Sequence, residues 1–117
     1  MSADIILGGG GLASSLAALA LRAAQPAARI LILDCASGPS DSHTWSFHGP
    51  DISPDWHARL APALVGDWRE QEVHFPGHSR RLRAGYSSMG SEGLARLLAE
   101  AGVETRWNAE IATLHED

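Results

Sequence analysis

A run of four glycines between two strongly apolar segments constrains the fold of this chain more than any other feature. Residues 4–8 are apolar without alternation, which predicts a short strand buried on both faces. Residues 12–24 predict a helix that ends before Pro26, and residues 29–34 predict a second buried strand. Together they predict a βαβ unit with parallel strands. From the spacing of its apolar residues, the helix is expected to bury Leu12, Leu16, Leu19, Ala20 and Ala23.

The glycine run has the form G-x-G-x-x-[G/S] of a dinucleotide-binding turn, with Ser14 at the third position. Gly9 allows the tight turn, and Gly11 allows a pyrophosphate to approach the backbone. The first helical residues, Leu12 and Ala13, offer free N–H groups and the positive end of the helix dipole. We therefore expect a Rossmann-like FAD/NAD(P)-binding fold of the α/β class, although a glycine-rich turn without a ligand remains the alternative.

An acidic residue stands where such a site needs one. Asp34 ends the second predicted strand, 25 positions after Gly9, and suits a hydrogen bond to a ribose hydroxyl. The alternative is an ordinary surface acid at a strand end. The motif does not separate FAD from NAD, but its place within a few residues of Met1 is typical of FAD-dependent two-domain proteins. No basic residue follows Asp34, which disfavours NADP at this site.

Weaker local patterns predict the elements that follow Asp34. Residues 36–55 are rich in Gly, Pro, Ser and Asp and read as a loop. We then expect a helix at 54–60 capped by Ser53, strands at 72–75 and 80–84 around Pro76-Gly77, a helix at 92–101 after Ser91, and strands at 103–107 and 110–114.

This order of elements predicts three segments along the chain. Residues 1–53 form the FAD-binding βαβ unit and its loop, and residues 54–85 lead toward a second, β-rich substrate domain. Residues 86–117 return to the nucleotide-binding domain, with 103–107 as its third strand. Because such a half-domain would leave apolar surface open, we expect the chain to be a fragment of a longer polypeptide.

Composition excludes several classes of protein. The net charge of −5 argues against nucleic-acid binding, which needs a basic surface. A single cysteine, Cys35, excludes an internal disulfide and a multi-cysteine metal site, and indicates a reducing cytoplasmic setting. His74 and His78 are four positions apart and would need a helix to bind one metal ion, but Pro76-Gly77 breaks such a helix. No metal site is therefore predicted. Neither a signal peptide nor a membrane span is expected.

The most distinctive run in the chain is His-Thr-Trp-Ser-Phe-His at residues 43–48. Together with the glycine turn, it resembles the N-terminal segment of bacterial lycopene β-cyclases. The resemblance covers essentially the whole chain and continues at Ala61-Pro62, Trp68, residues 73–76, Arg80-Arg81 and Gly85-Tyr86. Gly8, Ser14-Ser15 and Ser87-Ser88-Met89 depart from the usual pattern.

The resemblance implies an isomerase of carotenoid biosynthesis. Such enzymes close the ψ-ends of lycopene into β-ionone rings, giving γ-carotene and then β-carotene, through an acid-initiated carbocation. They need reduced FAD, with NADPH as the usual electron source, although the reaction has no net redox change. The family's acid is a glutamate in a later motif, so the catalytic residue is expected beyond Asp117 and the isolated chain is expected to be inactive. Contact of the full-length protein with the inner face of the bacterial cytoplasmic membrane is also implied.

The run at residues 43–48 supplies the remaining candidates. His43 and His48 are weak candidates for acid–base groups, and Trp45 is a candidate flavin contact. Structural packing is the alternative for all three, and Trp56, Trp68 and Trp107 are read as packing residues. Two other functions stay open: another FAD-dependent oxidoreductase of the monooxygenase type, and an inactive nucleotide-binding fragment.

Overall fold

The chain forms two units that draw on separate stretches of sequence. The computed structural model describes residues 2–39 and 43–116. One unit consists of Met1–Ser40 and Ala95–Asp117, and the other of Asp41–Leu94. The boundary at residues 94 and 95 falls inside one helix, α3 (Ser91–Glu100). The predicted divisions after residues 53 and 85 remain predictions for the complete protein.

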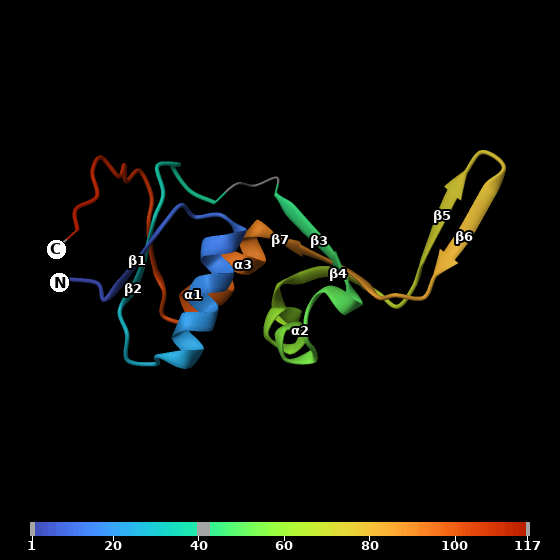
Figure 1. The fold of residues 1–117 in the computed structure, drawn as a ribbon, viewed down its shortest axis with the longest axis horizontal. Helices are drawn as coiled ribbons and strands as arrows, with labels where there is room; N and C mark the ends of the chain where they lie inside the picture. The colour runs from blue at the N-terminus through green and yellow to red at the C-terminus, as the bar shows by residue number, and fades with distance from the viewer. Residues whose placement is uncertain (1, 40–42, 117) are drawn as a thin grey trace. The chain divides into compact units, whose positions relative to one another are not determined.

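The first unit is built on a parallel sheet of three strands. Figure 1 labels β1 and β2 of this sheet beside helix α1. Strand β1 (Ile5–Gly8) is followed by helix α1 (Leu12–Ala24) and strand β2 (Ile30–Leu33). β2 is the central strand and pairs in parallel with β1 and with β8 (Glu104–Arg106). The predicted βαβ unit and the third strand of its sheet are therefore confirmed. The prediction that the first strand is buried on both faces is wrong, because Ile6 in β1 is 56% exposed.

The core of this unit forms where α1 and α3 meet the sheet. Its buried members are Ala18, Ile30, Ile32, Leu98 and Val103. The predicted buried face of α1 is wrong in part. Leu19 packs against the core and Leu12 and Leu16 are half-buried, but Ala20 and Ala23 are exposed, and the fully buried residues of the helix are Ser15 and Ala18. Small side chains let a helix backbone approach a neighbouring element closely, so these positions take the contact. The Ser15 hydroxyl donates to the Gly11 carbonyl at 2.8 Å, which satisfies the buried polar group.

Arg22 ties the end of α1 to two other segments of the first unit. Its Nη1 donates to the carbonyl oxygens of Pro26 at 2.8 Å and Ala28 at 2.6 Å. Its Nη2 donates to the carbonyl oxygen of Gly102, in the turn after α3, at 3.1 Å. One guanidinium therefore serves three carbonyl groups that have no helical partner.

The second unit contains an antiparallel sheet in the order β3-β7-β4. Its strands are β3 (Thr44–His48), β7 (Tyr86–Gly90) and β4 (Leu64–Trp68). The loop predicted over residues 36–55 is wrong at β3, and neither β4 nor β7 was predicted. These strands are rich in polar residues that the pairing itself satisfies, since the hydroxyls of Ser46 and Ser88 lie 2.8 Å apart across β3 and β7.

Helix α2 (Pro54–Leu60) confirms the predicted short helix of this unit. The Ser53 side chain accepts a hydrogen bond from the Trp56 N–H at 3.3 Å, so Ser53 is the predicted N-cap. Two short 3-10 helices, Gly49–Asp51 and Ala61–Ala63, flank α2.

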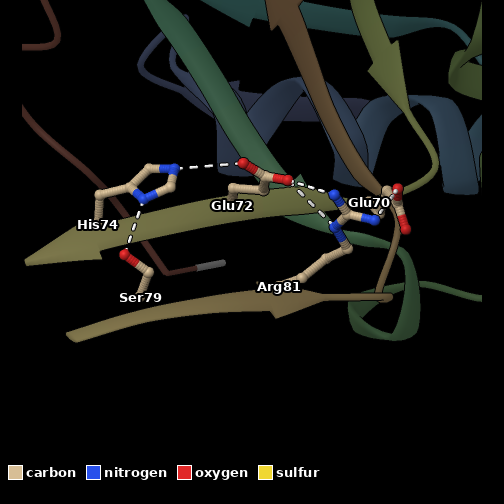
Figure 2. A network of polar contacts seen from close by, with 5 residues as sticks. All are labelled: Glu70, Glu72, His74, Ser79 and Arg81. Carbon is tan, nitrogen blue, oxygen red and sulfur yellow. Dashed lines mark hydrogen bonds and ion pairs between the residues drawn. The ribbon is translucent and has the colours of Figure 1, made fainter.

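A hairpin of β5 (Gln71–Phe75) and β6 (His78–Leu82) forms a separate two-stranded sheet. It confirms the predicted hairpin, with Gly77 in the left-handed region at φ +75°. Figure 2 shows a polar network on one face. Arg81 donates to Glu72 at 2.5 Å and lies 3.7 Å from Glu70, while His74 contacts Glu72 and Ser79.

The strand predicted over residues 110–114 is wrong. This segment has no regular secondary structure, and its apolar residues Ile111 and Leu114 are 44% and 89% exposed. A strand needs a partner for its backbone groups, and no described residue pairs with this segment. Within residues 2–39 and 43–116, no helix combines the length and the apolar character needed to cross a membrane.

Candidate functional site

The glycine turn lies at the carboxyl end of the parallel strands, where ligands bind in open α/β sheets. Gly9 follows β1 with φ +92°, a left-handed conformation that favours glycine. Its N–H donates to the carbonyl oxygen of Leu33 at 2.7 Å, which fixes the turn to the end of β2. Gly11 is the N-cap of α1 in an extended conformation. The motif therefore delivers the start of the helix to the edge of the sheet.

The turn leaves open space where a phosphate would approach. A Cβ atom added to Gly9 or to Gly11 would have no atom within 4 Å apart from those of the neighbouring residues in the chain. Among the described residues, α1 has no side-chain cap and no acidic residue in its first turn. Nothing on the helix therefore neutralises the positive end at Leu12 and Ala13. This geometry fits a pyrophosphate against the backbone of the turn.

Asp34 holds the glycine turn through hydrogen bonds to backbone groups. Its Oδ2 accepts from the Gly10 N–H at 2.5 Å, and its Oδ1 accepts from the Ala36 N–H at 2.7 Å. The N–H groups of Ala36 and Gly10 lower the pKa of the Asp34 carboxyl below its usual value. A carboxylate has about four lone-pair sites, so it can also accept from a ribose hydroxyl. Gly9, Gly11, Leu12, Ala13 and Asp34 are thus brought together at one edge of the sheet.

Trp107 also lies at this edge, although sequence reasoning read it as a packing residue at the end of the third strand. Its Cη2 atom lies 3.2 Å from the position that a Cβ on Gly10 would take, and Asp34 Oδ2 lies 3.1 Å from the same position. The signal was its place directly after β8, at the carboxyl end of a strand parallel to β2. Reading it as ordinary packing overlooked that position.

His43, Trp45 and His48 belong to the second unit and are parts of a strand and its approach, not of a loop. Trp45 is half-buried, with its ring centroid 5.6 Å from that of His43. The His48 N–H donates to the Asp51 carboxylate at 2.7 Å and caps the 3-10 helix that follows β3. The His48 ring lies edge-on to Tyr86 at 5.3 Å. These contacts favour structural roles for the histidines, and no described group of three or more His, Cys, Asp or Glu residues could hold a metal ion.

The parallel sheet, the glycine turn and the acid at the end of β2 define an α/β protein with the N-terminal part of a Rossmann-like, FAD/NAD(P)-binding fold. A family model described as lycopene cyclase protein matches residues 4–116, and the chain belongs to this family.

Sequence relatives and solved structures agree with this assignment. The chain is 54% identical to lycopene beta-cyclase of Paracoccus sp. (strain N81106 / MBIC 01143) over 97% of its own length and 30% of the relative's. It is 44% identical to lycopene beta-cyclase of Pseudescherichia vulneris over 89% of its length and 27% of the relative's. The chain thus spans less than a third of these relatives.

Two solved structures share the fold at low sequence identity. One is p-nitrophenol 4-monooxygenase PnpA from Pseudomonas putida DLL-E4, with TM-score 0.66 and 18% identity over 97% of this chain and 33% of that chain. The other is the halogenase PltM, with TM-score 0.61 and 19% identity over 98% of this chain and 30% of that chain. At these identities the likeness establishes the fold alone.

Proposed function

We propose that the chain is the FAD-binding, N-terminal part of a bacterial lycopene β-cyclase. The whole enzyme closes the ψ-ends of lycopene to β-ionone rings, giving γ-carotene and then β-carotene in carotenoid biosynthesis. The observation that carries this proposal is the 54% identity to a lycopene beta-cyclase over 97% of the chain. The family model supports it over residues 4–116.

In this proposal the first unit binds and orients FAD. Gly9 and Gly11 admit the pyrophosphate, the N–H groups of Leu12 and Ala13 donate to it, and Asp34 accepts from the adenosine ribose. When bound and reduced, with NADPH as the electron source, FAD supplies negative charge that stabilises the carbocation of ring closure. The reaction itself remains an isomerisation without net redox change.

Trp45 is proposed as a flavin contact because it places a half-buried aromatic ring on β3. His43 and His48 remain weaker candidates, since His48 already caps the 3-10 helix after β3. We place the catalytic acid outside this chain, so the chain alone is expected to be inactive. Lycopene is a long hydrocarbon, so the complete enzyme is proposed to bind peripherally at the cytoplasmic face of the bacterial membrane.

The proposal is tested by a chimera in which this chain replaces the segment it matches in the Paracoccus relative. In a lycopene-accumulating bacterium, the chimera is expected to make β-carotene and to retain FAD after purification. The chain expressed alone is expected to leave lycopene unchanged. A chimera that folds and binds FAD but leaves lycopene unconverted would contradict the proposed function.

Matched glycine variants link the activity to the turn. Gly11→Ala places a methyl group in the open space where the pyrophosphate approaches, so flavin content and β-carotene are expected to fall at least about tenfold, which corresponds to about 1.4 kcal/mol. Gly90→Ala is the control, because its added methyl would lie 3.7 Å from Val65 in ordinary contact. Equal flavin content in Gly11→Ala and Gly90→Ala would show that the glycine turn is not part of the FAD site.

A further inference from the structure

We propose that Trp107 forms an aromatic wall at the adenosine end of the dinucleotide site and stacks on the adenine base. The inference rests on the proposed FAD site and adds a binding residue to it. Three observations carry it: the rigid backbone that holds Trp107, the position of its ring, and its separation from the apolar core.

Hydrogen bonds to the end of β2 fix the backbone on both sides of Trp107. The Asp34 N–H donates to the Arg106 carbonyl at 3.0 Å. The Asn108 N–H donates to the Ala36 carbonyl at 2.8 Å, and the Ala109 N–H donates to the Asp34 carbonyl at 2.9 Å. Asn108 adopts φ +54°, a left-handed conformation that turns the chain directly after Trp107. The ring therefore projects from a segment whose place at the carboxyl end of the sheet is determined.

The ring reaches from β8 to the glycine turn. Its Cη2 atom and the Asp34 carboxylate converge on the same side of Gly10, where a Cβ would meet both at 3.2 and 3.1 Å. Asp34 is the proposed partner of the ribose, and adenine is bonded directly to that ribose. An aromatic ring beside Asp34 therefore lies next to the expected position of the adenine base.

Trp107 does not serve the core of its unit. It is half-buried, and the apolar cluster around Ala18 and Ile32, as described for this unit, does not include it. Near Gly10, the Trp107 ring lies beside the backbone of the glycine turn and the carboxylate of Asp34. A large ring held partly open beside polar groups offers a π-face to a flat partner, and every purine has one.

The test measures the binding of ADP and of inorganic pyrophosphate to the chain and to the flavin-free chimera. It distinguishes a Trp107 that stacks on adenine from a Trp107 that only supports the glycine turn. Base stacking on an aromatic ring predicts that Trp107→Ala weakens ADP binding about tenfold, whereas Trp107→Phe stays within about threefold of wild type. Pyrophosphate affinity is expected to be unchanged in both variants. Trp56→Phe, in α2 of the second unit, is the control that leaves both affinities unchanged.

The indole N–H resonances give an independent readout. Addition of ADP is expected to shift the resonance of Trp107, identified by its loss in Trp107→Phe, and to leave that of Trp56 in place. An unchanged ADP affinity in Trp107→Ala, or a parallel loss of ADP and pyrophosphate affinity, would overturn the stacking role. If neither ADP nor pyrophosphate binds the wild-type chain or the chimera, the dinucleotide site of the proposed function fails together with Trp107.

Discussion

The two units of the chain satisfy their polar groups in opposite ways. In the first, strands β1 and β2 are apolar, and the Asp34 carboxylate accepts from the Gly10 and Ala36 N–H groups at the strand ends, where the turn leaves space beside Gly9 and Gly11. In the second, polar side chains are paired within the sheet, as the Ser87 hydroxyl is to Asp67 at 2.8 Å. The hairpin adds the exposed pair of Arg81 and Glu72. The polar contacts of the first unit thus lie beside open space at the strand ends, whereas those of the second lie within its sheet and its hairpin.

The largest effect is expected from removing one buried side chain in each unit. Ile32 is fully buried in the first core, and Met89 is 1% exposed in the second unit. Truncation of either to Ala is expected to lower the free energy of unfolding by about 2–5 kcal/mol, through lost burial and a cavity. Chemical denaturation measures this loss.

Tryptophan fluorescence tells which unit is affected. Trp107 reports on the first unit, and Trp45, Trp56 and Trp68 report on the second. If the units unfold separately, Ile32→Ala is expected to shift mainly the unfolding transition reported by Trp107. Met89→Ala is then expected to shift mainly the transition reported by the tryptophans of the second unit. Equal shifts of both transitions in both variants would show that the two units unfold together. The difference between the units would then not extend to their stability.

A smaller effect is expected from Asp34→Asn. An amide cannot accept from both the Gly10 and the Ala36 N–H groups as the carboxylate does, so FAD binding should weaken about tenfold, roughly the lower end for hydrogen bonds to a charged group. Asp4→Asn is the control, because Asp4 also accepts from a backbone N–H, that of Arg29, but at the start of β1. Calorimetry with flavin-free chimeras measures both. Equal FAD affinities of Asp34→Asn and Asp4→Asn would show that Asp34 does not contribute to FAD binding.

Acid also tests the Asp34 carboxylate. Since its pKa is lower in the folded chain than in the unfolded one, its contribution to stability is complete above the ordinary value near 3.8 and is lost as pH falls through the folded pKa. The difference in melting temperature between wild type and Asp34→Asn should therefore stay constant from about pH 7 to about pH 5 and shrink as the pH falls further. A difference independent of pH would mean that the amide disturbs packing instead.

The smallest effect is expected from Glu72→Gln in the hairpin. Hydrogen bonds and charge from Arg81 lower the pKa of Glu72, so its contribution is present above the ordinary pKa and declines in acid below it. Both groups are about half exposed, so water and salt screen the pair. The change in melting temperature should be near the limit of detection and vanish at about 1 M salt. A large, salt-independent loss would show that the second unit depends on this pair.

The sequence predicted the βαβ part of the first unit well because its signals are local. The residues of α1 and the parallel pairing of β1 and β2 follow from apolar runs broken by Gly and Pro, and β8 was predicted because a helix followed by a strand returns after Ser91. The buried face of α1 escaped prediction because contact with neighbouring elements favours Ser15 and Ala18 over larger apolar residues. The glycine turn and Asp34 were predicted as a site, and the structure brings them together, whereas their ligand remains a proposal.

Prediction failed where pairing joins distant residues. Strand β7 reads Tyr-Ser-Ser-Met-Gly, which has no apolar alternation, yet Ser87 and Ser88 are buried. Ser88 meets its partner Ser46 at a separation of 42 positions, so no local window of sequence contains the reason for the strand. Trp107 escaped for a related cause, because its contact with Gly10 exists only once β8 lies beside β2.

The three hydrogen bonds of Arg22 have a consequence for how the first unit opens. Helix ends ordinarily fray independently, with each end exchanging its amide hydrogens at its own rate. Here the last turn of α1 cannot loosen without releasing the segment before β2 and the turn at Gly102 before β8. Amide hydrogens in these three places should therefore show one common free energy of opening in hydrogen exchange, because the three segments open in a single event.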